Sequence, residues 1–283
     1  MPPLRRGRVI SIRVGAFLAR AGFAIGRLLP LRARVVLATQ RSTRIGGNLA
    51  YVERELARRT PRIPVTALAH QARPGWGGRI EAAWHAVRAG YLLATARVFV
   101  VDEWFFAMYV IAPRRGTIRV QAWHGAGAFK KFGYSVLDKS FGPDEETIRI
   151  IPIHRNYDLC LVSSGSVIVH YMEAFRLPRE RFTSALGLPR TDLFFDRRHR
   201  AEAADAIHRR YELPTGKKML LYAPTFRGET VRGAHYDDVL DLATMREALA
   251  DDWTLLLRLH PYVRRSVTLG PELTGFAIDV SDW

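Results

Sequence analysis

Residues 117–133 read Thr-Ile-Arg-Val-Gln-Ala-Trp-His-Gly-Ala-Gly-Ala-Phe-Lys-Lys-Phe-Gly, a strand pattern that opens into a glycine-rich loop. Glycines let backbone N–H groups approach a ligand, and Lys130 and Lys131 add positive charge. His124 directly follows the strand pattern and can move a proton near neutral pH. The stretch therefore indicates a site for oxyanion chemistry. A purely structural pair also fits the same residues, in which Trp123 packs in the core and His124 has its hydrogen bonds satisfied there.

Apolar strand patterns alternate with helical patterns on both sides of this stretch. Such alternation predicts an α/β fold built on parallel strands, in which ligands bind at the carboxyl ends of the strands. Ser163 and Ser164 follow one strand and could cap the next helix or hold phosphate at its N-terminus. The expected strands are 34–39, 63–69, 98–101, 117–122, 158–162, 183–186, 218–222 and 254–259, and the expected helices are 46–59, 79–94, 167–175, 201–211 and 240–249.

Histidines follow two of the expected strands, one in each half of the chain. His124 follows the strand over 117–122, and His260 follows the strand over 254–259. Thr225 and Arg227 come after a third strand end. A base, a second imidazole and a guanidinium around one interdomain cleft suit phosphoryl transfer, which depends on positioning and charge stabilisation. The sequence contains neither metal-ligand spacing nor a P-loop, so no metal and no cofactor are expected.

The overall composition points to an anionic partner. The chain has 283 residues, a formal net charge of +16 and one cysteine, Cys160, which excludes an internal disulfide. Charge of this sign favours nucleic acid, phosphorylated substrates or an anionic membrane. The arginines are dispersed and no nucleic-acid-binding signature accompanies them, so nucleic acid is not an expected partner.

Residues 1–30 predict a basic amphipathic helix. The first 52 residues contain ten arginines and no acidic residue, and four of these arginines recur every seven residues from Arg6 to Arg27. An apolar stripe beside a basic stripe is typical of a helix that lies in a membrane interface. A core helix with a basic outer face is equally consistent, and no uninterrupted apolar run reaches membrane-spanning length. The apolar stripe comprises Ile10, Val14, Phe17, Leu18, Ala21, Ile25 and Leu28.

Five ordered motifs resemble the CDP-glycerol glycerophosphotransferase family, bacterial enzymes that prime and polymerise teichoic-acid-type polymers. The resemblance covers the chain from about Arg34, and Gly46–Tyr51 resembles an early segment of that family. The motifs are Trp123-His124-Gly125 with Lys130 and Gly133, Ser163-Ser164, Gly187-x-Pro189-Arg190-x-Asp192, Tyr222-Ala223-Pro224-Thr225-x-Arg227 and Leu259-His260-Pro261.

The resemblance implies a GT-B-type α/β fold of two facing Rossmann-like domains, here residues 31–185 and an incomplete second domain over 186–283. It implies that His124 deprotonates the acceptor hydroxyl, which attacks the β-phosphorus of CDP-glycerol and releases CMP. It further implies a lipid-linked glycan or polyol-phosphate acceptor and peripheral attachment to the cytoplasmic face of the membrane. The resemblance also implies a catalytic role for His260. The residues that it implies bind the donor phosphates are Arg227, Thr225, Arg258, Lys130, Ser163, Ser164 and Arg190.

The sequence departs from the family pattern at three places. Ala126-Gly127 replaces the usual Thr-Pro, and Leu188 stands where tyrosine is common. The family's later Asp-Tyr-Ser-Ser motif does not occur before Trp283, so we expect a truncated or degenerate relative with weak activity. Two alternatives remain open: a GT-B glycosyltransferase that uses a nucleotide sugar, and a non-catalytic protein that binds membranes or polyanions.

Overall fold

The computed structural model describes residues 6–137, 145–228, 233–237, 240–261, 263 and 269–282, and all statements below concern these residues. The chain divides into two compact units, Met1–Asp192 and Leu193–Trp283, each described here by itself. The predicted boundary at residue 186 lies slightly earlier. Leu188, beyond that boundary, is buried in a core cluster of the first unit, which explains the difference.

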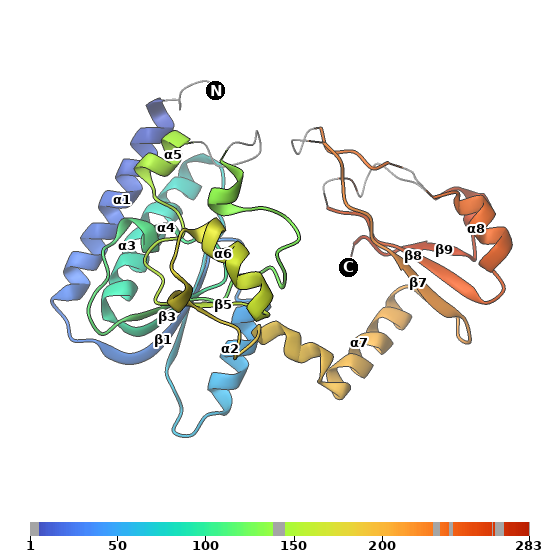
Figure 1. Cartoon of the computed structure of the whole chain (residues 1–283), viewed down its shortest axis with the longest axis horizontal. Helices are drawn as coiled ribbons and strands as arrows, with labels where there is room; N and C mark the ends of the chain where they lie inside the picture. The colour runs from blue at the N-terminus through green and yellow to red at the C-terminus, as the bar shows by residue number, and fades with distance from the viewer. Residues whose placement is uncertain are drawn as a thin grey trace. The chain divides into compact units, whose positions relative to one another are not determined.

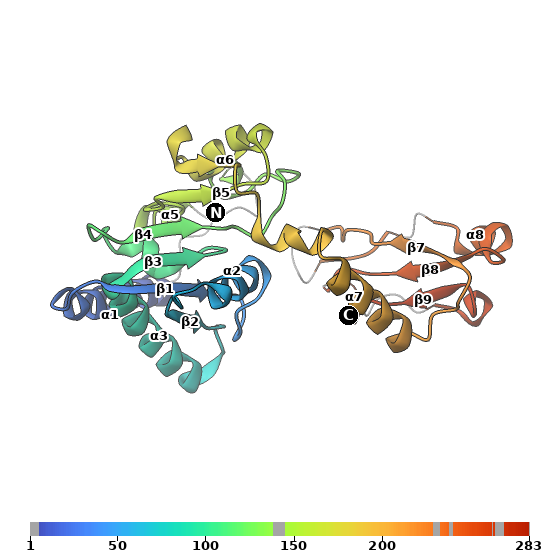
Figure 2. The ribbon, with the colours of Figure 1, turned by 90° about the horizontal axis from the view of Figure 1, so that it is seen from below.

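The first unit is built on a parallel sheet in the order β2-β1-β3-β4-β5-β6 (Figure 2). The α/β class with parallel strands is therefore confirmed. Chain order reverses direction between β1 and β3, and α/β sheets bind ligands outside the carboxyl ends of the strands at such a switch point. The strands are β1 Arg32–Thr39, β2 Val65–Ala69, β3 Ala96–Val101, β4 Ile118–Gln121, β5 Leu159–Leu161 and β6 Phe182–Thr183.

Alternate residues of the central strands face two separate hydrophobic clusters. Val36 and Ala38 of β1 pack on the side of α1 and α3, whereas Val35 and Leu37 pack on the side of α2. This burial on both faces explains the continuous apolar runs in the sequence, as expected for a covered parallel sheet. The helices of this unit are α1 Arg6–Arg27, α2 Gly47–Arg58, α3 Gly75–Thr95, α4 Phe106–Val110, α5 Glu145–Ile150 and α6 Ile168–Phe175.

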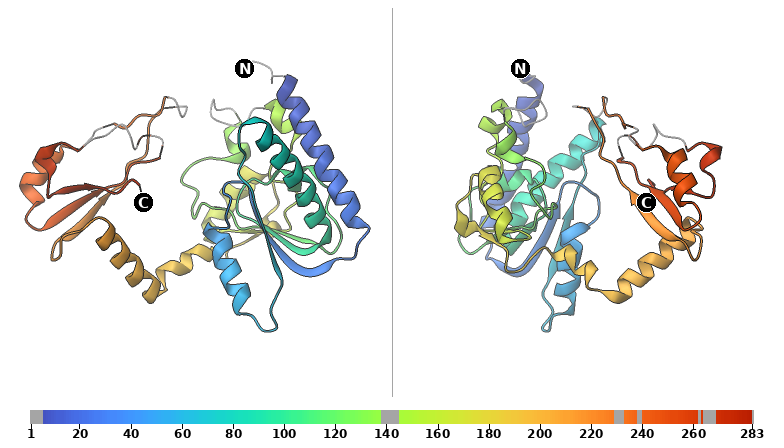
Figure 3. Two further views of the ribbon diagram at one scale, coloured as in Figure 1. Left: turned by 180° about the vertical axis from the view of Figure 1, so that it is seen from behind. Right: turned by 45° about the vertical axis from the view of Figure 1, so that its right-hand side comes forward.

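Helices α1 and α3 lie side by side on one face of the sheet (Figures 1 and 3). Small residues make this contact: Ala16 and Ala19 are buried, and a Cβ on Gly22 or on Gly90 of α3 would overlap backbone of the facing helix. Successive residues of an α-helix are rotated by about 100° around its axis. With this rotation, the contact face lies on the opposite side of α1 from the predicted apolar stripe. Five residues of the stripe are instead exposed, namely Ile10, Val14, Phe17, Ile25 and Leu28.

We expect Gly22→Ala to destabilise the protein, because the added methyl group would overlap the carbonyl oxygen of Val87. Forcing an extra carbon into a packed interface costs about 1–3 kcal/mol. Gly7→Ala, in the same helix with open space at the Cβ position, is the matched control. Thermal unfolding of both variants tests the contact. A Gly22→Ala protein as stable as Gly7→Ala would show that α1 does not pack closely on α3.

The second unit contains a parallel sheet in the order β7-β8-β9. Its core lies around Leu255 and Phe276, with a smaller cluster around Leu257 and Leu259 near the strand ends. Asp196 and Asp241 cap the N-termini of the two helices by accepting hydrogen bonds from backbone N–H groups. The elements are α7 Arg197–Arg210, β7 Lys218–Tyr222, α8 Leu242–Leu249, β8 Trp253–Leu257 and β9 Ala277–Asp279.

Candidate active site

A strained turn carries His124 out of β4. Trp123 has φ 47°, a left-handed conformation that bulky residues rarely adopt. Its backbone N–H donates to the side-chain oxygen of Gln121 at 2.8 Å, which holds the turn. Backbone strain of this kind persists where the surroundings enforce it, and it often marks a functional position.

An aromatic cluster fixes the Trp123 ring from several sides. The ring stacks on His124 with centroids 4.5 Å apart and on Phe132 at 5.2 Å. His154 and Phe175 meet it edge-on. Burial lowers the pKa of His154 to about 3, so this second histidine is a neutral packing group. The structural interpretation of the Trp-His pair is thus correct for Trp123, which packs in the cluster. His124 is only half-buried and lies at the edge of the cluster.

His124 is oriented for use as a base. Its Nδ1 lies 3.3 Å from the backbone carbonyl oxygen of Asp102. A carbonyl oxygen can only accept, so Nδ1 carries the proton and Nε2 keeps its lone pair. Burial, and then the charge of Arg41, lower the pKa of His124 below its ordinary value. A neutral imidazole with an unprotonated Nε2 is the state that a general base requires.

Asn48, at the start of α2, ties three segments to this turn. Its side-chain amide donates to the carbonyl oxygens of Ala122 and Trp123, and its oxygen accepts the backbone N–H of Arg190 at 3.0 Å. The side chain is 1% exposed. The structure therefore brings Arg190 to the His124 turn, although their sequence motifs lie far apart. In the sequence, Asn48 lies in the expected helix start and in the Gly46–Tyr51 segment that resembles the family, and neither pattern predicts this positioning role.

The loop after His124 is anchored at both ends. The Tyr171 hydroxyl donates to the carbonyl oxygen of Gly125 at 3.0 Å. Gly133 has φ 57°, and a Cβ there would overlap the Ala174 carbonyl oxygen, so only glycine fits. Lys130 is exposed on this loop and forms no hydrogen bond or ion pair within the described parts of the chain. Its assignment to donor phosphate stays a prediction.

Ser163 and Ser164 follow β5, the strand next to β4. Ser164 precedes a short 3₁₀ helix, Gly165–Val167, but makes no side-chain capping bond. Its hydroxyl lies 2.8 Å from that of Ser166 instead. The expected capping of the next helix is therefore not what the structure shows. Both serines follow the end of β5, and their assignment to donor phosphate stays a prediction.

The second unit places its predicted residues after β7 and β8. Arg227 pairs with Asp237 at 3.6 Å between partly exposed side chains, and its backbone bridges to His235. Phe226 contacts the His260 ring with centroids 4.6 Å apart. Thr225 lies exposed one residue before Phe226. These contacts bring three of the predicted residues together at one edge of the small sheet.

Arg258 differs from the other predicted phosphate ligands. Its backbone N–H donates to the Tyr222 carbonyl oxygen, and its guanidinium donates to the Val280 carbonyl oxygen at 3.3 Å. The residue thus links the ends of β7, β8 and β9. This bond points to a role in holding the strand ends together, and phosphate binding by Arg258 stays a prediction.

The geometry describes an α/β protein with a neutral histidine base at the carboxyl ends of one parallel sheet and a guanidinium–imidazole group at the edge of another. Within the described residues, no group of three His, Cys, Asp or Glu side chains could hold a metal ion. A base and a cationic group suit the positioning and charge stabilisation on which transferases of activated phosphate compounds depend.

Residues 23–283 match the family described as CDP-glycerol:poly(glycerophosphate) glycerophosphotransferase, and the chain belongs to this family. It is 37% identical over 263 residues to a teichoic acid ribitol-phosphate primase of Bacillus spizizenii, covering 91% of this chain and 66% of that protein. It is 30% identical over 276 residues to a teichoic acid poly(ribitol-phosphate) polymerase of the same organism, covering 96% and 43%. The chain thus spans less than two thirds of these relatives.

The fold also resembles solved structures of the wall teichoic acid polymerase TagF. A TagF variant soaked with CDPG superposes with a TM-score of 0.69 and 17% identity, covering 96% of this chain and 66% of that chain. At this identity the likeness concerns the fold. It agrees with the α/β architecture found here.

Proposed function

We propose that this protein transfers glycerol phosphate, or a similar polyol phosphate, from a CDP-activated donor to a glycan or polyol-phosphate acceptor linked to a lipid. The observation that carries the proposal is the neutral His124, held by the Asp102 carbonyl oxygen at the end of β4, in a chain of this family. The names of the relatives and the CDPG-soaked TagF structure support a CDP-polyol donor.

In the proposed reaction, His124 Nε2 accepts the proton of an acceptor hydroxyl. The hydroxyl oxygen forms a bond to the β-phosphorus of the donor while the bond from that phosphorus to the CMP oxygen breaks. CMP leaves with the bonding electrons, and the product is a phosphodiester. The protein supplies position and charge stabilisation, which are the main requirements of phosphoryl transfer.

The donor phosphates are assigned to Arg227, His260 and Thr225 of the second unit, with Ser163, Ser164, Lys130 and Arg190 contributed by the first. The family resemblance, which implies a GT-B-type fold, supports this grouping. A guanidinium can bind phosphate oxygens in bidentate fashion, which suits Arg227 to the diphosphate. His260 contacts Phe226 beside it, which fixes the imidazole near the same strand end.

The test of the proposal is CMP release from a panel of donors. CDP-glycerol and CDP-ribitol are each incubated with the protein and a lipid-linked glycan acceptor, alongside UDP- and GDP-sugars. We expect CMP from a CDP-polyol and no nucleotide release from the sugars. UDP or GDP release without CMP would instead identify a glycosyltransferase, and release from no donor would favour a non-catalytic binding protein.

Arg227→Ala is expected to weaken donor binding by roughly one to two orders of magnitude, since charge-assisted hydrogen bonds contribute about 1.5–3 kcal/mol. Isothermal titration with CDP-glycerol measures the change. Arg198→Ala is the matched control, because Arg198 pairs with Glu202 in α7 and has no assigned role. Equal affinities of the two variants would remove Arg227 from the donor site.

We also propose that the outer face of α1 and α3 binds an anionic membrane, on the cytoplasmic side where such lipids are enriched. Phe17, Ile25 and Leu28 of α1 are exposed, and Trp76 and Trp84 of α3 are 79% and 68% exposed. Ile25 and Trp84 line a shared groove between the two helices. The exposed Arg13 and Arg27 flank this apolar face, and each arginine near an anionic surface contributes about 1 kcal/mol.

Residues Gly7–Arg27 are also long and apolar enough to cross a membrane, by length and composition only. Arginines interrupt this stretch, so it contains no uninterrupted apolar run of membrane-spanning length. The backbones of α1 and α3 approach each other closely at Gly22 and at Gly90. This close approach supports a helix α1 that lies on the protein surface. A helix lying in the membrane interface with its apolar side buried among lipids is consistent with that contact.

The double variant Phe17→Ser/Ile25→Ser is expected to lose about two to four orders of magnitude of affinity for anionic vesicles, since burying each such side chain contributes roughly 1.5–3 kcal/mol. Sedimentation with anionic and with neutral vesicles measures this. Val169→Ser/Leu186→Ser, which replaces exposed apolar residues elsewhere on the unit, is the control. Binding that is equal on neutral and anionic vesicles, or unchanged in the double variant, would contradict membrane attachment through this face.

A further inference from the structure

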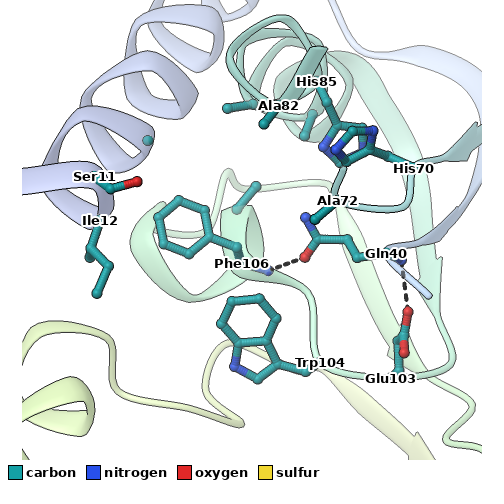
Figure 4. Close-up of a pocket in the computed structure, with 14 residues that line it drawn as sticks. Ser11, Ile12, Gln40, His70, Ala72, Ala82, His85, Glu103, Trp104 and Phe106 are labelled. Atoms are coloured by element: carbon teal, nitrogen blue, oxygen red, sulfur yellow. Dashed lines mark hydrogen bonds between the residues drawn. The ribbon is translucent and has the colours of Figure 1, made fainter. Parts of the chain in front are cut away.

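A cavity of about 400 Å³ opens at the carboxyl ends of β1, β2 and β3, between α1, α3 and α4 (Figure 4). Its volume falls within the range of about 300–1,000 Å³ that is typical of small-molecule sites. It also lies beside the switch point of the sheet, between β1 and β3, where α/β proteins bind ligands. None of the residues discussed so far for the donor lines it.

Two histidines form one wall of this cavity. The rings of His70 and His85 stack with centroids 4.6 Å apart, and His85 is 8% exposed. The Nε2 atoms of both rings are buried and have no hydrogen-bond partner in the described parts of the chain. Burial lowers the pKa of His85 to about 4, so its imidazole is neutral. Buried polar atoms are normally satisfied, so these two point to a missing polar ligand.

Further polar groups converge on the same wall. The side-chain oxygen of Gln40 accepts the backbone N–H of Phe106 at 3.0 Å, and its amide nitrogen lies on the side of the histidine pair (Figure 4). Glu103 also lines the cavity, and one carboxylate oxygen accepts the Gln40 backbone N–H at 2.7 Å. Trp104, which is 38% exposed, offers a ring at the cavity.

We propose that this cavity binds an uncharged sugar residue, the glycan part of the acceptor, with hydroxyls on His70, His85 and Gln40 and a ring face on Trp104. A sugar has a polar and an apolar surface. Its hydroxyls need hydrogen-bond donors and acceptors, and its C–H face packs on an aromatic ring. The assignment of this sugar to the acceptor rests on the proposed function; the binding of a sugar does not.

The lining disfavours other ligands. It contains no lysine or arginine among the described residues, although the chain carries a net charge of +16, and it includes the Glu103 carboxylate, which lies 4.0 Å from the guanidinium of Arg41. A phosphate group would therefore meet this carboxylate and no cation in the lining itself. A lipid chain would leave the Nε2 atoms of His70 and His85 without partners, which is unfavourable for buried polar groups.

The cavity is linked to His124 through two adjacent residues. Glu103 lines the cavity, and the carbonyl oxygen of Asp102 accepts the Nδ1 proton of His124. Gln121, just before the His124 turn, donates to the Glu103 carbonyl oxygen at 2.9 Å. A sugar in this cavity would therefore lie on the segment that orients the base.

The test is direct binding of neutral glycosides. Methyl β-glucoside, methyl β-galactoside and methyl N-acetyl-β-glucosaminide are titrated into the protein without donor, by saturation-transfer NMR, with glycerol 3-phosphate as the anionic comparison. We expect at least one glycoside to bind and glycerol 3-phosphate not to compete with it. Trp104→Ala should weaken that binding about tenfold, in line with an aromatic contact of roughly 1–1.5 kcal/mol.

Phe195→Ala, at an exposed aromatic residue outside the cavity, is the control and should bind as the unaltered protein does. His70→Gln, which keeps hydrogen-bonding atoms on a half-buried residue, should weaken binding less than His70→Ala. Binding of no glycoside, equal binding by Trp104→Ala and Phe195→Ala, or competition by glycerol 3-phosphate would overturn the proposal. Because no donor is present, these results are independent of CMP release, which tests the proposed function separately.

Discussion

The His124→Gln variant is expected to lose transfer activity by a factor of about 10²–10⁴, the usual contribution of a general base. The physical reason is that Nε2 is the proton acceptor, and glutamine has no comparably basic atom. CMP release with CDP-glycerol and acceptor measures the rate. Donor binding should stay unchanged when measured by titration, because His124 is not among the residues that we assign to the donor phosphates.

His170→Gln is the matched control, since His170 is exposed on α6 of the same unit. The pH dependence gives a second readout. Because the pKa of His124 is lowered, the acid limb of kcat/KM should inflect below pH 6.5, with activity falling as the imidazole becomes protonated. Arg41, Arg190 and Glu103 surround this group, and the two arginines disfavour its protonation. Full activity in His124→Gln would remove the base from the mechanism.

The Asn48→Ala variant is expected to lose both stability and activity. The change leaves the Ala122 and Trp123 carbonyl oxygens and the Arg190 N–H without the side chain that joins them. Each buried group without a partner costs about 1–3 kcal/mol, so we expect at least about 2 kcal/mol in the free energy of unfolding. The strained turn that presents His124 should relax, and kcat should fall by more than about tenfold because misplacement of a reacting group is costly.

Asn156→Ala separates the two effects. Asn156 also ties backbone carbonyls, and the hydrogen bonds that its side-chain amide donates go to those of Met108 and Ile111 and not to the His124 turn. It should cost stability without a comparable loss of kcat. Measuring unfolding and CMP release for both variants decides the matter, because parallel losses in the two proteins would mean that Asn48 acts through stability alone.

The sheets could be predicted from the sequence because their strands are continuous apolar runs. Val36 and Leu37 are buried on opposite faces of β1. This strand therefore appears in the sequence as a continuous apolar run and not as an alternation of apolar and polar residues. Helix α3 was predicted to begin at residue 79, whereas it begins at Gly75. Glycines at 75, 77 and 78 lower the helix propensity of this first turn, and tertiary packing overrides them.

The packing face of α1 could not be predicted from hydrophobicity. Its large residues, such as Phe17, suggest the side that would be buried, yet Ala19 and Gly22 make the contact with α3. Backbones that approach closely need small side chains, and that signal is weak in a sequence rich in alanine and glycine. The exposed apolar stripe and the basic flank nevertheless agree with the interfacial pattern that the sequence indicates.

The candidate site was predictable in part, because His124 and His260 each follow a strand. The role of Asn48 was not, since it depends on contacts with Trp123 and with Arg190, far along the chain. The cavity was also hidden, because the ends of three separate strands and three helices form it. Such convergence is a property of the fold and has no local sequence signal.

The most direct test of the account is phosphorus NMR of one reaction that contains this protein, CDP-glycerol and a lipid-linked glycan acceptor. The account predicts that the donor diphosphate signals decrease while CMP and a new phosphodiester increase in equal amounts, and that His124→Gln shows neither product. Persistence of the donor signals, or CMP accompanied by free glycerol phosphate in place of the phosphodiester, would contradict it.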